Sequence, residues 1–304
     1  MTDRGQIEAT YRDIQSEFCL AVEVFDGVER FGVDEWHRAG GGGGITRILS
    51  GPGHIEKAAV NFSAVQGDTP EVLSERLAVQ SSSFYATGVS IIVHPRNPLA
   101  PTFHANIRYF EADGGTAWFG GGADLTPYYL DENDARHFHR TLAAICERHA
   151  IADYAAWKQG CDEYFYLPHR GEARGVGGIF FDHLTDRLEE VWGFQSDLGR
   201  NLIDLYLPIL EKHVDDEYGD REREWQEVRR GRYAEFNLVW DRGTRFGLET
   251  SGRTESILAS LPPRARWVYG HEAEPGSPEA ALLDLVEGTP RDWVSPPSPK
   301  PESR

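Results

Sequence analysis

The chain has 304 residues, of which 40% are hydrophobic, and its 49 acidic residues against 31 basic ones give a formal net charge of −18. These values indicate a globular protein with a sizeable core, and the acidic balance argues against binding to nucleic acid or to an anionic membrane. No apolar run reaches the roughly 18 residues that would predict a membrane span, and the first residues carry no apolar stretch typical of a signal peptide. The three cysteines lack CxxC spacing and are typical of reduced thiols, so we expect a cytoplasmic protein.

Hydrophobic periodicity places the predicted elements along the chain. An amphipathic helix opens it at residues 6–24, and the glycines at 40–44 are interpreted as a flexible turn into a strand, because they lack the spacing of a phosphate-binding loop. A helix is predicted at 69–86, strands at 88–94, 102–110 and 115–119, helices at 132–149 and 198–213, strands at 232–240 and 244–249 around a turn, and a short helix at 254–260. Because the strands cluster like hairpins with helices between the clusters, we predict one α+β domain with a largely antiparallel sheet over residues 1–295. The Pro-rich residues 296–304 are predicted to form a disordered tail.

The strand predicted at 102–110 carries the most informative pattern. Side chains alternate between the two faces of a strand, so His104, Asn106 and Arg108 share one face while Phe103 and Ile107 point to the other. The apolar face can enter a core, and the polar face offers a proton donor, an amide and a cation in a row, each about 7 Å from the next. An ordinary solvated face is the alternative, although such faces usually carry Thr, Lys, Glu and Ser. We therefore predict a functional site on this strand.

Four histidines form a candidate metal site. If the strands predicted at 88–94 and 102–110 pair as a hairpin, His94 comes close to His104. Ser90 lies on the same face of its strand as His94. Two neighbouring histidines can bind a divalent metal or pass a proton. His139 lies in a predicted helix and His169 follows an aromatic segment. Each of these histidines alone is explained as well by a structural role, so the metal site is a hypothesis.

A glycine-rich segment at Gly120–Gly122 is a second candidate site. Three glycines let the backbone approach a ligand closely, and Asp124, which follows them, can accept hydrogen bonds from ligand N–H groups. The alternative interpretation is a glycine-rich turn in which Asp124 is a cap. Without further context the turn is the simpler explanation.

A third candidate is the loop formed by Ser251, Gly252 and Arg253. A small, flexible pair there presents an arginine before a predicted helix, a combination that suits a carboxylate ligand. The alternative is that Thr254 is a plain helix N-cap. Further cations that could assist, or form surface ion pairs instead, are Arg170, Arg174, Arg242 and Arg245.

Together these motifs resemble the oxygen-dependent coproporphyrinogen-III oxidases. The stretches that carry the resemblance are GGGGITRIL (41–49), VNFSAVQG (60–67), HPRNPLAPTFHANIRYFE (94–111), WFGGGADLTPYYL (118–130), HFHRTL (137–142), CDEYFYLPHRGEARGVGGIFFD (161–182), RRGRYAEFNLVWDRGTRFGLETSGRTESILASLPP (229–263) and PRDWV (290–294). They follow one another in family order over nearly the whole chain. The departures are minor, with Ala64 where a bulkier aliphatic residue is commoner and Ala123 at a position that varies.

The resemblance implies a fold and a reaction. The fold is a large, rather flat antiparallel β-sheet covered by α-helices on both faces, in a homodimer whose interface includes residues near 233–268. The reaction is the oxidative decarboxylation of two propionate groups of coproporphyrinogen III to vinyl groups, which gives protoporphyrinogen IX and releases CO2 and H2O2. Molecular oxygen is the co-substrate, and no flavin, haem, nicotinamide or other organic cofactor takes part.

The resemblance also implies roles for the candidate residues. His104 corresponds to the proton donor and Asp124 to the acid that holds the pyrrole N–H groups, so these two are the expected catalytic residues. The positions that correspond to substrate-binding residues are Ser90, Asn106, Ile107, Arg108, Ser251, Gly252 and Arg253. A divalent metal, Mn or similar, is assigned in bacterial members to the positions of His94, His104, His139 and His169, although the family is not uniform in needing it.

The residues themselves are compatible with this reaction. A substrate with four propionates needs cations inside an acidic protein, and Arg108 and Arg253 lie in two of the candidate segments. Two competing hypotheses remain open. A metal-dependent oxygenase or hydrolase that uses the four histidines would lose all activity on chelation, and a tetrapyrrole carrier would bind coproporphyrinogen without consuming oxygen.

Overall fold

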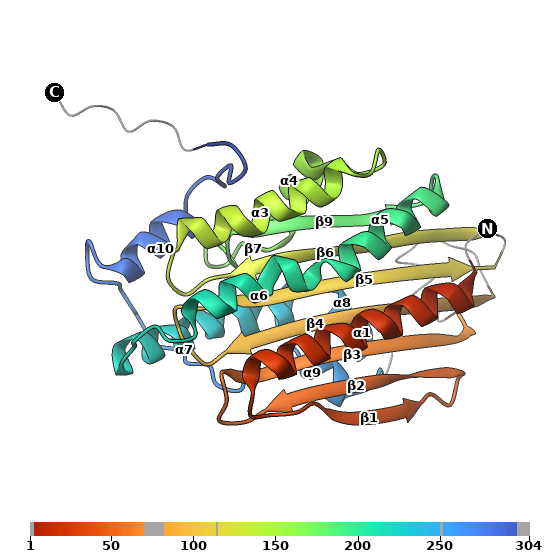
Figure 1. Cartoon of the computed structure of the whole chain (residues 1–304), viewed down its shortest axis with the longest axis horizontal. Helices are drawn as coiled ribbons and strands as arrows, with labels where there is room; N and C mark the ends of the chain where they lie inside the picture. Colours follow the sequence, from red (N-terminus) through yellow and green to blue (C-terminus); the bar gives the residue numbers. More distant parts are fainter. Residues whose placement is uncertain (1–2, 70–81, 114, 250–251, 297–304) are drawn as a thin grey trace.

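Seven antiparallel strands form the central sheet of the protein in the computed structural model (Figure 1). The structure describes residues 3–69, 82–113, 115–249 and 252–296. The strands lie across the sheet in the order β1-β2-β3-β4-β5-β6-β9, so the first six are neighbours both in sequence and in space. Their bounds are β1 Gly32–His37, β2 Gly42–Ser50, β3 Ile55–Asp68, β4 Ser83–Pro95, β5 Thr102–Ala112, β6 Thr116–Thr126 and β9 Gly177–Leu184, and the short β7 Tyr166–Leu167 and β8 Glu172–Ala173 pair separately.

Helices cover both faces of this sheet (Figure 1). The near face in Figure 1, which carries Phe103, lies under α1 Arg4–Asp26, α3 Glu132–Glu147, α5 Leu188–Arg200 and α6 Leu202–His213, with α4 Tyr154–Tyr164 beside β9. The far face, which carries His104, lies against α7 Asp220–Glu235, the π-helix η1 Phe236–Trp240, α8 Arg242–Glu249 and α9 Thr254–Leu258, and α10 Pro278–Val286 follows. The predicted α+β fold, with an antiparallel sheet and helices on both faces, is confirmed.

The near face of the sheet carries the main core. Phe103 of β5 is fully buried, with its ring 4.8 Å from that of Tyr206 in α6 and 6.0 Å from that of Phe18 in α1. Ile107 and Tyr109 are buried on the same face, because alternate side chains of a strand point to the same side. The two-faced pattern predicted for residues 102–110 is therefore confirmed, and the even-numbered side chains of β5 face the other way.

Residues 232–240 and 242–249 are helical, so the two strands predicted there are wrong. The chain forms the end of α7, then η1 and α8. The buried face of α7 includes Arg229 and Arg230, whose charged side chains are not counted in a pattern of apolar residues. Conversely, Leu238 and Trp240 are apolar but exposed. Together with Phe236 they place an apolar residue at every second position, which is the pattern of a half-buried strand.

The remaining predictions agree with the structure with small differences. Residues 83–86 belong to β4 rather than to a helix, and 70–81 lie outside the described residues, as do 297–304 of the predicted tail. The helix predicted at 198–213 is the end of α5 followed by α6. The glycine turn is confirmed, because Gly41 and Gly42 have φ values of 112° and 82°, which L side chains rarely adopt. Among the described helices, none is both long and apolar enough to cross a membrane.

Candidate functional site

A row of small and polar side chains crosses the far face of the sheet. The strand register pairs Asn61 with Ser90, Ser90 with Asn106, and Asn106 with Gly122. Paired residues on neighbouring strands have Cβ atoms about 5 Å apart on the same face. Helix α9 packs over the β3 end of the row, where Asn61 Nδ2 donates to the carbonyl oxygen of Ser256 at 3.0 Å. The predicted site residues Ser90 and Asn106 are thus direct neighbours.

Arg108 stands in the next row, in register with Gly88 and Gly120. Its Nη2 lies 2.8 Å from Oδ1 of Asp182 in β9, and its Nη1 donates to Oδ1 of Asn106 at 2.8 Å. A Cβ atom on Gly120 would lie 2.5 Å from that Asp182 oxygen, so the missing side chain leaves room for the ion pair. Because 36% of the Arg108 side chain is exposed, an anion from solvent can reach it.

His104 is connected to Asp124 across the same face. Asp124 lies inside β6, in register with His104, so the interpretation of Asp124 as a turn cap is wrong. His104 Nδ1 is 2.7 Å from Asp124 Oδ1. Arg174, from the segment between β8 and β9, donates from Nη2 to both oxygens of Asp124, at 2.8 and 2.7 Å. The three side chains form one hydrogen-bonded chain.

The carboxylate of Asp124 is buried and ionised. Burial alone would raise the pKa of Asp124, but the Arg174 charge and the hydrogen bond from His104 lower it below its ordinary value. Both oxygens accept hydrogen bonds from protein groups and only 3% of the side chain is exposed, so the carboxylate is held mainly by Arg174 and His104. The expected contact between Asp124 and pyrrole N–H groups stays a prediction. Among these three hydrogen-bonded side chains, His104 is the one that can face a ligand, because 23% of its side chain is exposed.

The loop with the second predicted arginine is described in part. Ser251 lies outside the described residues, and the backbone N–H of Gly252 donates to the carbonyl oxygen of Gly247 at 2.7 Å. Arg253 forms an ion pair with Asp34 of β1. Its Nη1 atom is buried and has no hydrogen-bond partner among the described residues. A buried donor without a partner is costly, so an anionic ligand would stabilise this arginine.

Ile107 faces away from the polar residues of β5. Its side chain is fully buried in the near-face core, because odd-numbered residues of this strand point to that face. The prediction that Ile107 binds substrate is therefore wrong for its side chain.

The four histidines expected to bind a metal do not converge within one chain. His94 and His139 are fully buried, and burial lowers the pKa of both, that of His139 to about 3. His139 belongs to α3 on the near face, so the sheet separates it from His104. His169 instead pairs with Glu235, with Nε2 and Oε2 2.8 Å apart. Among the described residues these four histidines do not offer a set of close ligand atoms, and they do not fit a single ion.

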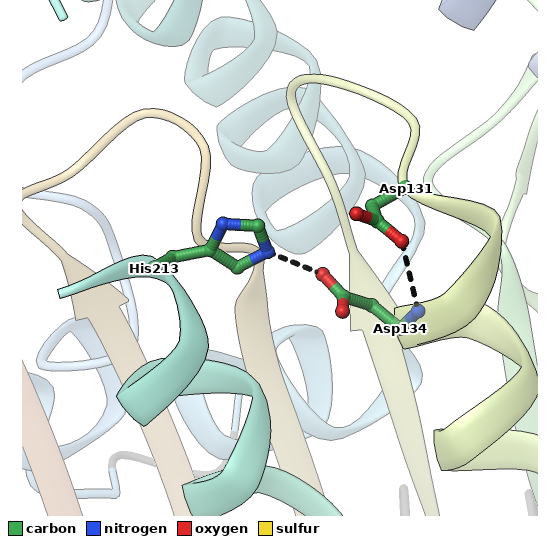
Figure 2. Close-up of side chains that lie close together, drawn as sticks. All are labelled: Asp131, Asp134 and His213. Carbon is green, nitrogen blue, oxygen red and sulfur yellow. Dashed lines mark hydrogen bonds and ion pairs between the residues drawn. The ribbon is translucent and has the colours of Figure 1, made fainter. Parts of the chain in front are cut away.

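Another cluster has ligand atoms at metal-like spacing. One atom each of Asp131, Asp134 and His213 lies within 4.8 Å of the others, and Figure 2 shows His213 at the end of α6 reaching Asp134 at the start of α3. Lys212 Nζ already contacts the carboxylates of Asp131 and Asp134, at 2.5 and 2.7 Å. The cluster is therefore an ion-pair network that joins α3 to α6.

His213 makes the stability of this network depend on pH. Burial alone would lower the pKa of His213, but hydrogen bonds to Asp134 and Asp216 raise it above its ordinary value. A raised pKa means that the stabilisation is complete below the unfolded pKa of about 6.5 and is lost as the pH rises through the folded value. We expect the unfolding midpoint of the unmodified protein to fall from pH 6 to pH 9 by more than that of His213→Gln in thermal melts. Equal falls in both proteins would contradict this.

Two residues of the site were missed from the sequence, and a third was left undecided. Asp182 lies at the end of a recognised motif but no pattern assigns it to Arg108. Asn237, whose Oδ1 accepts a hydrogen bond from Arg174 Nη1 at 3.0 Å, fell in a segment predicted as a strand. Arg174 was one of four possible cations. Its partner Asp124 is 50 residues away in sequence, and no local spacing predicts which carboxylate a distant arginine contacts.

The chain also matches a family model described as coproporphyrinogen III oxidase, over residues 6–293. The chain belongs to the coproporphyrinogen III oxidase family. The matched range includes every strand of the sheet and each described residue of the candidate site. As a coproporphyrinogen oxidase, the protein is an oxidoreductase of haem and porphyrin biosynthesis, and the resemblance seen in the motifs is confirmed.

Proposed function

We propose that this protein converts coproporphyrinogen III into protoporphyrinogen IX, with molecular oxygen as the electron acceptor. For each of two propionic acid groups, a C–H bond at the β-carbon and the bond to the carboxyl carbon break, a vinyl double bond forms, and CO2 leaves. The two electrons and two protons reduce O2 to H2O2. The observation that supports this most is a partly exposed arginine and a partly exposed histidine on one face of one strand, an anion-binding group and a proton-transfer group that one ligand could reach.

The far face of the sheet suggests how the substrate lies. His104 and Arg108 are four residues apart on β5, about 13 Å at the rise of a strand, which is on the scale of a tetrapyrrole with its side chains. Arg108 binds one propionate, and Ser90 and Asn106 offer hydrogen bonds between the two ends. Arg253, in the loop before α9, binds a second propionate. His104 moves a proton at the reacting side chain through Nε2.

The reaction as proposed uses no organic cofactor. A porphyrinogen is an electron-rich reduced macrocycle, so it can supply the electrons for O2 itself. The four predicted metal ligands do not fit one ion within the chain, and no step is assigned to a metal. The family's metal assignment to these histidines stays a prediction.

An oxygen-electrode assay with chemically reduced coproporphyrinogen III tests the proposal. We expect the purified protein to consume about one O2 per propionate lost and to form protoporphyrinogen IX. Parallel samples contain a chelator or no oxygen. Full conversion without oxygen, or none in air by folded protein, would refute the proposal. Substrate binding without oxygen uptake would favour a carrier, and complete loss on chelation would favour a metal-dependent enzyme.

We also propose that the protein is a homodimer that uses residues near 233–268. Six large apolar side chains within this segment are 40 to 56% exposed in the single chain, namely Leu238, Val239, Trp240, Leu248, Trp267 and Val268. Such a concentration is typical of a protein–protein interface. Light scattering at micromolar concentration should give twice the 34.1 kDa of one chain, and Trp267→Glu should shift the mass toward one chain. The mass of one chain for the unmodified protein would contradict this.

A further inference from the structure

Arg174 is a buried cation to which the proposed reaction gives no role. Only 2% of its side chain is exposed, and its guanidinium carbon lies 4.0, 4.6 and 4.7 Å from the ring centres of Phe165, Tyr233 and Phe236. Its Nη1 donates to Oδ1 of Asn237 at 3.0 Å. Burying a charge is costly even when it is paired, and such pairs can be retained because they fix a geometry.

The contact with Arg174 fixes the plane of the Asp124 carboxylate. Arg174 Nη2 donates to both oxygens, at 2.8 and 2.7 Å. The arginine is itself held from two sides, since its backbone N–H donates to the carbonyl oxygen of Phe165 at 2.9 Å and its Nη1 binds Asn237 of η1. A carboxylate bound at both oxygens by a fixed donor cannot rotate freely, so Asp124 presents Oδ1 in one direction.

His104 takes its orientation from that same oxygen. Its Nδ1 lies 2.7 Å from Asp124 Oδ1. An ionised carboxylate only accepts hydrogen bonds, so Nδ1 must carry the proton. Nε2, on the other side of the ring, then accepts a proton when the ring is neutral and donates one when the ring is charged. Within the described residues Nε2 forms no hydrogen bond with the protein.

We propose that Arg174 is a positioning residue that acts through Asp124 to hold His104 in its Nδ1–H form, with Nε2 directed at the substrate. The inference rests on the proposed function for the identity of the substrate, but the protonated nitrogen of His104 is a property of the free protein. Arg174 itself touches neither substrate nor the reacting atoms. A purely structural role for Arg174 would affect the stability of the protein and leave the state of the His104 ring unchanged.

Arg229 supplies a matched control. It is a second buried arginine, with 3% of its side chain exposed, and its Nη1 contacts both oxygens of the buried Glu172, at 3.1 and 3.0 Å. It also lies near the aromatic ring of Trp225, 5.8 Å from its centre. Arg229→Met therefore removes a buried arginine–carboxylate pair without removing a contact to Asp124 or His104.

The decisive measurement is 15N NMR of protein labelled at histidine, in the absence of substrate and with His104 assigned through His104→Asn. The unmodified protein and Arg229→Met should both show His104 with its neutral-state proton on Nδ1. Arg174→Met should show a mixture of the two neutral forms. In the oxygen assay, Arg174→Met should lower kcat roughly 10- to 100-fold, while KM changes by less than about threefold. Arg174→Lys, which keeps the charge but has a single nitrogen to serve both Asp124 and Asn237, should give a smaller loss.

Each result supports or overturns the inference. A proton on Nε2 in the unmodified protein would overturn it without any variant, and so would an unchanged His104 signal in folded Arg174→Met. If Arg174→Met does not fold, Arg174→Lys provides the same comparison, and a His104 signal identical to the unmodified protein would count against the proposal. An inactive protein with the Nδ1–H form intact would refute the proposed function and leave the positioning role standing.

Discussion

Replacing His104 by Asn is expected to lower kcat by about 100- to 10,000-fold, the usual contribution of a general acid or base. Asn keeps a short N–H donor that can still bind Asp124 Oδ1, which lies 2.7 Å from Nδ1 of the native ring. It removes Nε2, the atom through which the proton is proposed to move. Because substrate binding is assigned to other residues, KM should change little. Steady-state oxygen uptake at saturating coproporphyrinogen III measures both constants.

The exposed His37 of β1 provides the control for this prediction. His37→Asn makes the same chemical change outside the site and should leave kcat unchanged. Thermal melts of both variants test whether the fold is intact. A His104→Asn protein that melts normally and turns over within about threefold of the native rate would remove His104 from the reaction.

Replacing Arg108 by Gln is expected to raise KM by about 30-fold or more. Removing one partner of a hydrogen-bonded charge pair costs about 2–5 kcal/mol, and about 1.4 kcal/mol corresponds to a factor of ten. The lower end applies here because 36% of the side chain is exposed, so water can partly solvate the propionate. If Arg108 also places the reacting propionate, kcat should fall together with the rise in KM.

Arg187, which forms a surface ion pair with Glu190 and is 49% exposed, provides the matched control. Arg187→Gln removes an equal charge and should leave both kinetic constants unchanged, so a general effect of net charge can be separated from the local one. The ion pair of Arg108 with Asp182 adds an internal test, because Asp182→Asn removes a carboxylate that competes with the substrate for Arg108. An unchanged KM for Arg108→Gln with a normal melting temperature would exclude Arg108 as a propionate-binding residue.

Local pattern was sufficient for the strand that organises the site. Side-chain alternation along 102–110 separated His104 and Arg108 from Phe103 and Ile107, and the structure places the two pairs on opposite faces. This worked because the period of a strand is fixed by backbone geometry. The resemblance of motifs along the chain was also sufficient for the family. The resemblance assigns roles to positions and does not show which way a side chain points, and so Ile107 was included among the substrate-binding residues.

Tertiary structure decided the features that depend on partners distant in sequence. The helices at 232–240 and 242–249 were missed in part because the buried side of α7 includes charged residues such as Arg229, whose partner Glu172 comes from another element. The same reason applies to the site. The sequence pattern around Asp124 is also compatible with a turn, and only the structure shows that it lies inside the sheet and pairs with Arg174. The four histidines were interpreted as one possible ligand set, but the sheet separates His139 from His104. Periodicity and motif spacing determine which way a side chain points, whereas the charge and hydrogen bonds that it meets are set by how the elements pack.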